Sequence, residues 1–428
     1  MDDLNSMRPR VLLSAYACEP WKGSEPGVGW NVAHLMARDY EIWVITRSNN
    51  RPAIEEALSQ TTHDSLHFVY YDLPAWARWW KRGHRGVQLY YYLWQIGIYF
   101  LARKLHRHTK FHLAHHVTFG KYWCPSLISL LPIPFIWGPV GGGESAPRKL
   151  WTSLGARGIL LEILRELARF LFEIDPLVRV TAKRSRIILS KTLETSVHLK
   201  RLGAASVQIF GESAISDEEL GRFSESRSQE VQYIKMISIG RVLPWKGFSL
   251  GIQAFATALQ RCEELNGAEY WVVGDGPDRE RLLGLSNKLG IASRVKFWGA
   301  LPREKTIQML LECDVLVHPS LHDSGGWVCL EAMAAGKPVI CLDLGGPATQ
   351  VTENAGFRVF PGSRTQVISD ITNIMTQLAK NPALLRQKGI SARSLIASEF
   401  LWDHKRDSLN TLYKKVLAAN TALADSCS

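Results

Sequence analysis

The chain has few cysteines, and none of them form a C-x2-C pair. Its seven cysteines are scattered along 428 residues and are odd in number, so the sequence indicates neither a disulfide framework nor a zinc site of paired thiols. The polar N-terminus runs directly into a short apolar segment and lacks the long apolar core of a secretory signal. We therefore expect reduced, mostly buried thiols and a cytoplasmic protein.

Acidic residues are missing from residues 73–143. The same stretch holds many cations and aromatic rings: Arg78, Lys81, Arg82, Arg85, Arg103, Lys104, Arg107, Lys110 and Lys121, with Trp76, Trp79, Trp80, Tyr90, Tyr91, Tyr92 and Trp94 among them. Such a mixture favours an anionic membrane surface. The apolar run at 89–102 is too short to span a bilayer, which needs about 20 residues. The segment at 76–110 is therefore expected either to lie on the inner face of the membrane or to pack its rings on the sheet.

Disorder is excluded by a composition of 46% hydrophobic and 21% charged residues. The length suits two domains of roughly 200 residues each. A net charge of +11 favours an anionic partner, such as nucleotide phosphates or lipid headgroups. We recognise no nucleic-acid-binding module, so no nucleic acid is expected.

Short apolar runs recur, each followed by a longer amphipathic stretch, which is typical of a parallel sheet covered by helices. Strands are predicted at 11–16, 42–46, 67–71, 113–117, 135–137 and 187–190, and again at 236–239, 270–273, 295–298, 315–318, 339–342 and 356–359. The predicted fold is α/β with two doubly wound, Rossmann-like domains. The expected domains are 1–211 and 234–398, and a linker at 212–233 joins them. A C-terminal helix is expected at 399–428, and one possibility is that it packs back on the first domain.

Two carboxylates follow the predicted strand at 315–318. Asp323 lies in the loop and Glu331 about one turn into the next helix. Ligands of open parallel sheets bind at the carboxyl ends of strands, and the N–H groups at a helix start attract phosphate. A carboxylate there repels phosphate but accepts hydrogen bonds from vicinal hydroxyls, so a sugar or ribose is the natural partner.

Asp323-x7-Glu331, followed by AMAAGKPVI and a Gly-Gly turn, resembles the E-x7-E region of retaining GT-B glycosyltransferases of family 4 (glycosyl transferases group 1). The resemblance implies that the first acid faces the transferred sugar and the second holds the ribose hydroxyls. Asp323 stands where Glu is usual, and Ser-Gly-Gly-Trp stands where Ser/Gly-Phe-Gly is usual. We expect Gly325, Gly326 and Trp327 to line the donor site with Glu331.

Other segments of the second half resemble further elements of that family. Gly-Arg-x4-Lys-Gly implies that Arg241 and Lys246 neutralise the diphosphate. The VGDGP turn implies close approach of the donor at Gly274 and Gly276, and KFWGAL implies that the segment of Trp298 holds the base.

In the first half, the resemblance implies that Gly27 and Gly29 make backbone contacts with the donor, the alternative being that they only allow a tight turn. A dinucleotide site is disfavoured because the third glycine is replaced and the second strand ends in Arg47. The resemblance implies that a histidine near 115–116 contacts the sugar. His116 is our choice, with His115 in reserve.

The expected activity is thus a metal-independent retaining hexosyltransferase without a cofactor. It would move sugar from a UDP- or GDP-linked donor to a sugar or lipid-linked acceptor, in polysaccharide or glycan assembly. Asp323, His116, Arg241 and Lys246 would be its catalytic residues. A nucleotide-sugar epimerase of the same fold and a non-catalytic transferase scaffold remain alternatives.

Overall fold

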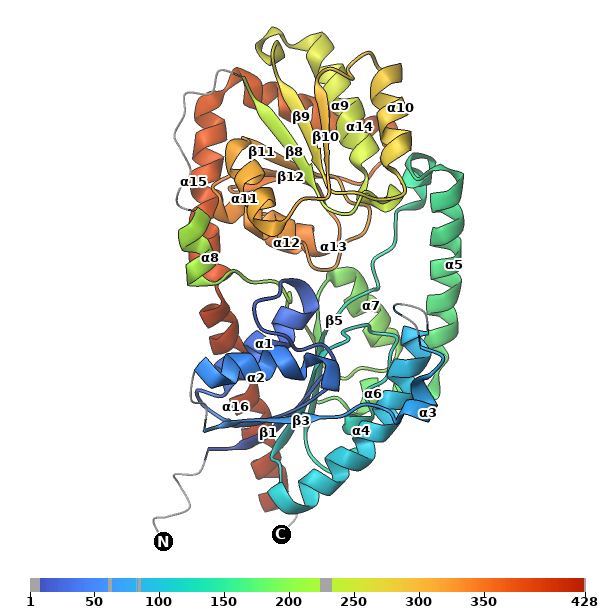
Figure 1. Cartoon of the computed structure of the whole chain (residues 1–428), viewed down its shortest axis with the longest axis vertical. Coiled ribbons are helices and arrows are strands. Elements are labelled where there is room, and N and C mark those ends of the chain that lie inside the picture. Colours follow the sequence, from blue (N-terminus) through green and yellow to red (C-terminus); the bar gives the residue numbers. More distant parts are fainter. Residues whose placement is uncertain (1–7, 61–63, 82, 84–85, 224–232, 427–428) are drawn as a thin grey trace. The chain divides into compact units, whose positions relative to one another are not determined.

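The computed structural model describes residues 8–60, 64–81, 83, 86–223 and 233–426. Most of the predicted linker, at 224–232, and the cations Arg82 and Arg85 lie outside these ranges. Within them the chain forms two compact units, each built on one parallel sheet with helices on its faces (Figure 1).

Each unit is assembled from more than one stretch of chain. The first comprises Met1–Gly143, Ala168–Glu212 and Asp403–Ser428, and the second comprises Glu144–Leu167 and Ser213–Trp402. The sequence predicts a continuous first domain at 1–211, whereas residues 144–167 group with the second unit. The physical reason is apolar contact, because Ala146, Leu150 and Leu154 are buried in the core of the second sheet.

The first unit contains a seven-stranded sheet in the order β3-β2-β1-β4-β5-β6-β7, with every neighbouring pair parallel. Its strands are β1 (Arg10–Ala15), β2 (Glu41–Thr46), β3 (Leu66–Tyr70), β4 (Leu113–Thr118), β5 (Phe135–Val140), β6 (Ile187–Ser190) and β7 (Val207–Ile209). The chain starts in the middle of the sheet and winds outwards in both directions, as in Rossmann folds.

The helices of the first unit are α1 (Ser24–Met36), α2 (Arg51–Gln60), α3 (Ala75–Arg78), α4 (Val87–Thr109), α6 (Pro176–Arg184), α7 (Leu193–Arg201) and α16 (Trp402–Ser426). Helix α5 (Gly155–Glu173) begins in the second unit and ends in the first. The C-terminal helix α16 packs on the first sheet. Its Tyr413 is fully buried, and the hydroxyl lies 2.6 Å from Nδ1 of His115 on β4.

The second unit has a six-stranded parallel sheet in the order β10-β9-β8-β11-β12-β13, which is again the Rossmann order. Its strands are β8 (Lys235–Ile239), β9 (Glu269–Val273), β10 (Val295–Gly299), β11 (Val315–His318), β12 (Val339–Leu342) and β13 (Gly356–Val359). Its helices are α8 (Asp217–Arg222), α9 (Phe248–Arg261), α10 (Arg279–Lys288), α11 (Arg303–Glu312), α12 (Trp327–Ala334), α13 (Gly345–Gln350), α14 (Arg364–Lys380) and α15 (Pro382–Glu399).

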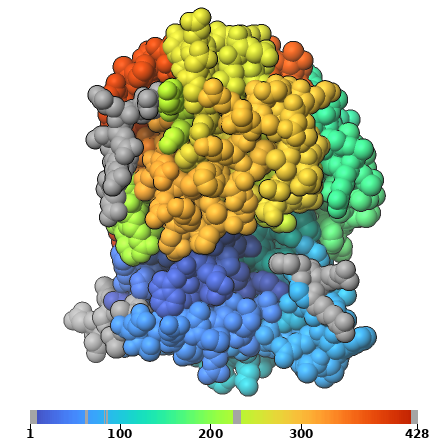
Figure 2. Space-filling view, turned by 45° about the horizontal axis from the view of Figure 1, so that its top comes forward, coloured from blue at the N-terminus to red at the C-terminus, as the bar shows by residue number. Residues whose placement is uncertain are grey.

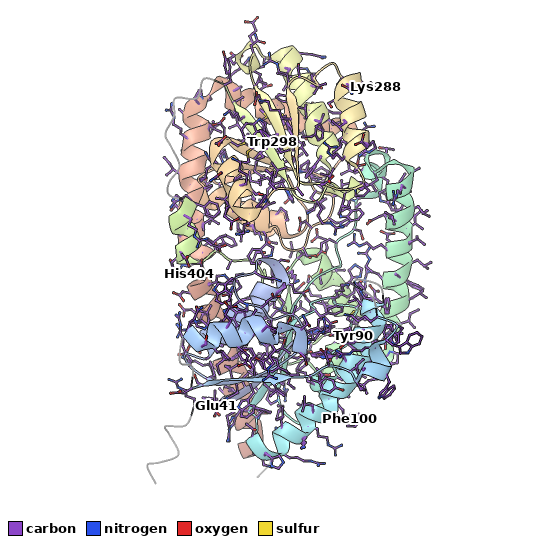
Figure 3. All side chains as sticks on the ribbon, viewed as in Figure 1. Glu41, Tyr90, Phe100, Lys288, Trp298 and His404 are labelled. Carbon is purple, nitrogen blue, oxygen red and sulfur yellow. The ribbon has the colours of Figure 1, made fainter. Side chains whose placement is uncertain are left out.

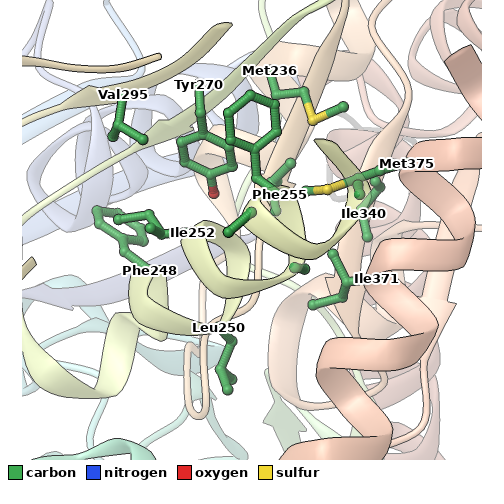
Figure 4. Packing of buried hydrophobic residues seen from close by; sticks show 14 of the residues in the cluster. Met236, Phe248, Leu250, Ile252, Phe255, Tyr270, Val295, Ile340, Ile371 and Met375 are labelled. Atoms are coloured by element: carbon green, nitrogen blue, oxygen red, sulfur yellow. The ribbon is translucent and has the colours of Figure 1, made fainter. Parts of the chain in front are cut away.

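Helix α9 supplies much of the core of the second unit. Phe248, Ile252 and Phe255 recur at helical spacing and are buried in one cluster with Tyr270 of β9 and Met375 of α14 (Figure 4). Such packing fixes the strand ends of the second sheet, and the site described next lies on the loops that leave those ends.

The predicted strands coincide with β1–β6 and β8–β13. The bounds agree within one residue at either end, except that β5 continues to Val140. Strand β7 is not predicted. Of the helices in the described ranges, none is both long and apolar enough to cross a membrane.

Candidate functional site

The loop after β11 is held in place by the carboxylate of Asp323. Its Oδ1 accepts hydrogen bonds from the backbone N–H groups of Gly325 and Gly326, each at 3.2 Å, at the start of α12. Its Oδ2 accepts a hydrogen bond from Lys246 Nζ at 2.5 Å and lies 3.1 Å from His318 Nε2. Because Lys246 follows β8 and Asp323 follows β11, the contact ties together the ends of two paired strands.

Electrostatics keep Asp323 ionised. Its side chain and that of Lys246 are only 17% and 20% exposed. Burial alone would raise the pKa of Asp323, but Lys246 and His318 together lower it well below its ordinary value. Burial lowers the pKa of His318, so its ring is neutral at pH 7. The cluster therefore holds one anion beside one cation, and a phosphate that reached Lys246 would share that cation with Asp323.

Glu331 lies one turn into α12 and is also paired. Its side chain is 15% exposed, and Oε1 accepts a hydrogen bond from Nη1 of Arg303 at 2.7 Å. The other guanidinium nitrogen, Nη2, donates to Glu219 Oε1 at 2.8 Å. Burial raises the pKa of Glu331, although Arg303 opposes the change. Arg303 is absent from the predicted site. Its signal in the sequence is its place just after β10, where open parallel sheets carry ligand contacts.

Gly274 and Gly276 mark a close approach of two loops. A Cβ atom on Gly274 would lie 2.0 Å from the carbonyl oxygen of Gly240, and one on Gly276 would lie 2.3 Å from that of Val242. The glycines therefore let the loop after β9 pack on the loop after β8, which carries Arg241. The contact of these glycines with a donor stays a prediction.

Three other predicted residues of the second unit, Arg241, Trp298 and Trp327, differ in how far they are exposed. Arg241 is exposed just after β8. Trp298 on β10, labelled in Figure 3, is 41% exposed. Its ring meets that of Trp271 edge-on, with centroids 5.6 Å apart. Trp327 opens α12, and its buried Nε1 has no hydrogen-bond partner among the described residues.

Residues 144–167 bring further carboxylates to the same unit. Ser324 Oγ, in the loop after β11, donates to Glu144 Oε2 at 2.6 Å. Glu162 is almost fully buried, and its Oε2 lies 3.3 Å from Nε2 of His322. Burial alone would raise the pKa of Glu162, but His322, a backbone N–H and Arg165 lower it to about 2. Glu144 and Glu162 thus contact the two residues that flank Asp323 in its loop. These contacts join residues far apart in the sequence, so local sequence does not predict them.

The glycines of the first unit fill steric roles. A Cβ atom on Gly27 would lie 1.9 Å from the carbonyl oxygen of Lys22, and one on Gly29 would lie 2.2 Å from that of Ala17. Packing of α1 against the loop after β1 therefore requires both glycines. Whether their N–H groups also meet a donor stays a prediction.

Both candidate histidines are completely buried on β4. The His115 ring lies 2.7 Å from the Gly138 carbonyl oxygen and 2.6 Å from the Tyr413 hydroxyl. The Nε2 atom of His116 lies 3.5 Å from the hydroxyl of Tyr91. Burial lowers their pKa values to about 4 and about 3, so both rings are neutral at pH 7. The sugar contact expected of His116 stays a prediction.

The aromatic rings of the segment at 76–110 differ in burial. Tyr90, Tyr91 and Trp94 on α4 are buried in the core of the first unit. Trp76 and Trp79, on and just after α3, are 78% and 76% exposed. The buried rings agree with the alternative that the segment packs on the sheet. The membrane contact stays a prediction, and only the exposed rings could make it.

The cysteines fit the expectation of buried thiols. Those within the described ranges are buried and free: Cys18, Cys124, Cys262, Cys313, Cys329 and Cys341. In the same ranges, no three His, Cys, Asp or Glu side chains converge as they would to hold a metal ion.

Solved structures that superimpose on this chain include GT-B glycosyltransferases. Sucrose-phosphate synthase from Thermosynechococcus elongatus superimposes with a TM-score of 0.65 and 17% identity, covering 96% of this chain and 100% of that one. HepE from Anabaena, solved in complex with UDP, superimposes with a TM-score of 0.59 and 16% identity, covering 95% and 100%. At these identities the likeness establishes the fold, which is GT-B with two Rossmann-like domains.

The sequence comparisons cover part of the chain. Residues 222–390 match the model of the family Glycosyl transferases group 1. A curated relative, 2-deoxystreptamine N-acetyl-D-glucosaminyltransferase from Streptomyces fradiae, is 32% identical over 174 residues, which is 39% of this chain. The matched part spans only 40% of the length of that relative. The family segment contains Arg241, Lys246, Arg303, Asp323 and Glu331.

Proposed function

We propose that this protein is a retaining glycosyltransferase that moves a hexose from a UDP- or GDP-linked donor to a hydroxyl acceptor. The observation that carries the proposal is the pairing of Lys246 with Asp323 and of Arg303 with Glu331 on loops at the strand ends of the second sheet. Both pairs lie inside the segment that matches the family. HepE, which shares the fold, binds UDP.

The donor would be held by charge and by hydroxyl recognition. Arg241 and Lys246 neutralise the departing diphosphate, and Lys246 is already positioned by Asp323 before the donor arrives. Oε1 of Glu331 is held by Arg303, and Oε2 accepts hydrogen bonds from the ribose hydroxyls. The preformed pairs reduce the reorganisation needed when the donor binds.

In the proposed transfer step, Asp323 and His116 orient the sugar. The acceptor hydroxyl attacks the anomeric carbon on the face of the leaving group. Its proton passes to the departing phosphate oxygen, and the bond between that oxygen and the anomeric carbon breaks. The two cations supply the charge stabilisation that a metal ion gives in other transferases, so we propose that no metal is needed.

The acceptor is proposed to be a sugar or a lipid-linked glycan at the inner face of the membrane. Exposed Trp76 and Trp79, with the exposed cation Arg78 between them, support this setting. Interfacial tryptophans and cations are the groups that anionic headgroups attract.

The experiment is donor turnover by wild type and by Glu331→Ala. Release of UDP or GDP from nucleotide sugars should be lost in the variant, while its thermal unfolding shows that the second unit remains folded. Glu353→Ala, at an exposed acid of the same unit, is the matched control and should turn over donor like wild type. Undiminished turnover by Glu331→Ala refutes the site. Conversion of the donor to an epimer without acceptor would instead identify an epimerase.

A further inference from the structure

Helix α5 turns an apolar face towards solvent. Five of its apolar side chains and that of the adjoining Ile174 are more than half exposed, and together we call them the α5 stripe: Leu160, Leu164, Leu167, Phe170, Leu171 and Ile174. Their spacing of three or four residues places them on one side of the helix. Leu161 and Ile163, which are 42% and 47% exposed, border this stripe. Scattered apolar residues are normal on a surface, but a contiguous stripe marks an interaction site.

The polar face of α5 is the one that packs on the protein. Glu162 is buried against His322, and Arg169 is buried with Nη1 donating to the Gly142 carbonyl oxygen at 3.3 Å. A surface helix of a globular protein usually buries its apolar face instead. Since the polar groups of α5 already have partners inside the protein, the helix cannot turn its apolar stripe inwards without breaking these contacts. The contacts of the polar face therefore hold the apolar stripe on the surface.

The exposed charges of the stretch of chain that contains the stripe have one sign. Between residues 144 and 184, the exposed charged residues are all cations: Arg148, Lys149, Arg157, Arg179, Lys183 and Arg184. The acids of the same stretch are buried or only partly exposed. An apolar stripe whose adjoining segments of chain expose only cations is complementary to a bilayer that carries anionic headgroups.

From these observations we infer that the α5 stripe is a docking surface for an anionic lipid bilayer, in which the helix lies along the interface. From Leu160 to Ile174 the stripe is about 21 Å long, at 1.5 Å per residue. Its leucines enter the acyl boundary while the flanking cations remain among the headgroups. Figure 2 shows the blue-green atoms of α5 at the surface, on the right of the view. This surface is separate from the proposed transfer reaction and does not depend on it.

A second copy of the chain is the competing occupant. Two α5 stripes packed against each other would bring the same cations of both copies close together, and like charges oppose such contact. The charge pattern therefore favours lipid over a homodimer.

The test is sedimentation of the full chain with vesicles made of phosphatidylglycerol and phosphatidylcholine in equal amounts. Wild type should bind, and Leu164→Gln/Leu167→Gln/Leu171→Gln should bind at least about tenfold more weakly. All three side chains are exposed, so the variant should melt like wild type. Vesicles of phosphatidylcholine alone should bind wild type more weakly, because the headgroup attraction is removed.

The matched control is Leu193→Gln/Phe360→Gln/Ile390→Gln, which removes apolar side chains that are even more exposed, from elsewhere on the chain, and should bind vesicles within about twofold of wild type. Equal binding by wild type and the α5 variant would overturn the inference. The inference would also be overturned if wild type did not bind vesicles and instead formed a dimer that the α5 variant does not form. Donor turnover, measured in solution without lipid, should be the same in the α5 variant and in wild type, so loss of vesicle binding is distinguishable from loss of activity.

Discussion

The ion pair between Lys246 and Asp323 allows a quantitative test by a double-mutant cycle. Their charged atoms are 2.5 Å apart, and both side chains are about one-fifth exposed. Removing one partner of a fully buried pair costs about 3–5 kcal/mol, because the remaining charge is left uncompensated. Allowing for partial solvent screening, we expect Lys246→Met and Asp323→Asn each to destabilise the second unit by about 2–4 kcal/mol.

The double variant removes both charges at once. Asparagine can still accept the N–H bonds of Gly325 and Gly326, so we expect a total cost below the sum of the single costs, with a coupling free energy of about 2–3 kcal/mol. The assay is denaturant unfolding followed by tryptophan fluorescence, with circular dichroism to identify the transition of the second unit. Costs that add to within about 0.5 kcal/mol would show that the two residues do not interact and would refute the reasoning.

Three more predictions concern the second unit. Because the folded-state pKa of Glu162 is lowered to about 2, its ionised form stabilises the unit by roughly 3 kcal/mol at neutral pH, and this contribution is lost as the pH falls below about 4 towards 2. Glu162→Gln should therefore melt lower than wild type at pH 7, with a melting temperature that falls less steeply on acidification; parallel curves would contradict this. Gly276→Ala should cost about 1–3 kcal/mol by forcing its loop away from Val242, as measured by unfolding, and an unchanged midpoint would contradict the close approach. Arg303→Ala should weaken UDP or GDP binding about tenfold at pH 7. Without the Arg303 guanidinium the pKa of Glu331 rises further, and less of the carboxylate that accepts the ribose hydroxyls remains ionised. An unaltered affinity, measured by calorimetry, would show that Arg303 does not contribute to the site.

Most of the fold could be predicted because parallel sheets leave a strong local pattern. Buried strands such as β9 and β12 are short apolar runs, and their predicted bounds agree closely with the structure. Strand β7 was missed since it has three residues, none of them buried, at the edge of its sheet. The grouping of residues 144–167 with the second unit depends on long-range contacts of Leu150 and Leu154, which leave no local signal.

The candidate site was predictable only in part. Short motifs locate Lys246, Asp323 and Glu331 in the sequence, but the partners of these residues come from other elements, as Arg303 does. The histidines of β4 show a related limit. A central strand is covered on both faces, so side chains pointing either way are buried, and alternation along the strand cannot identify one that is exposed.

Binding of the bare nucleotide diphosphate tests the central claim most directly. UDP and GDP are titrated calorimetrically into wild type, Arg241→Gln and, as a matched control, Arg279→Gln on α10. We predict that one diphosphate binds wild type and the control alike, and that Arg241→Gln weakens its binding at least about tenfold through loss of a charge-assisted contact. If neither nucleotide binds wild type, or if Arg241→Gln binds as tightly as the control, the proposed donor site is contradicted.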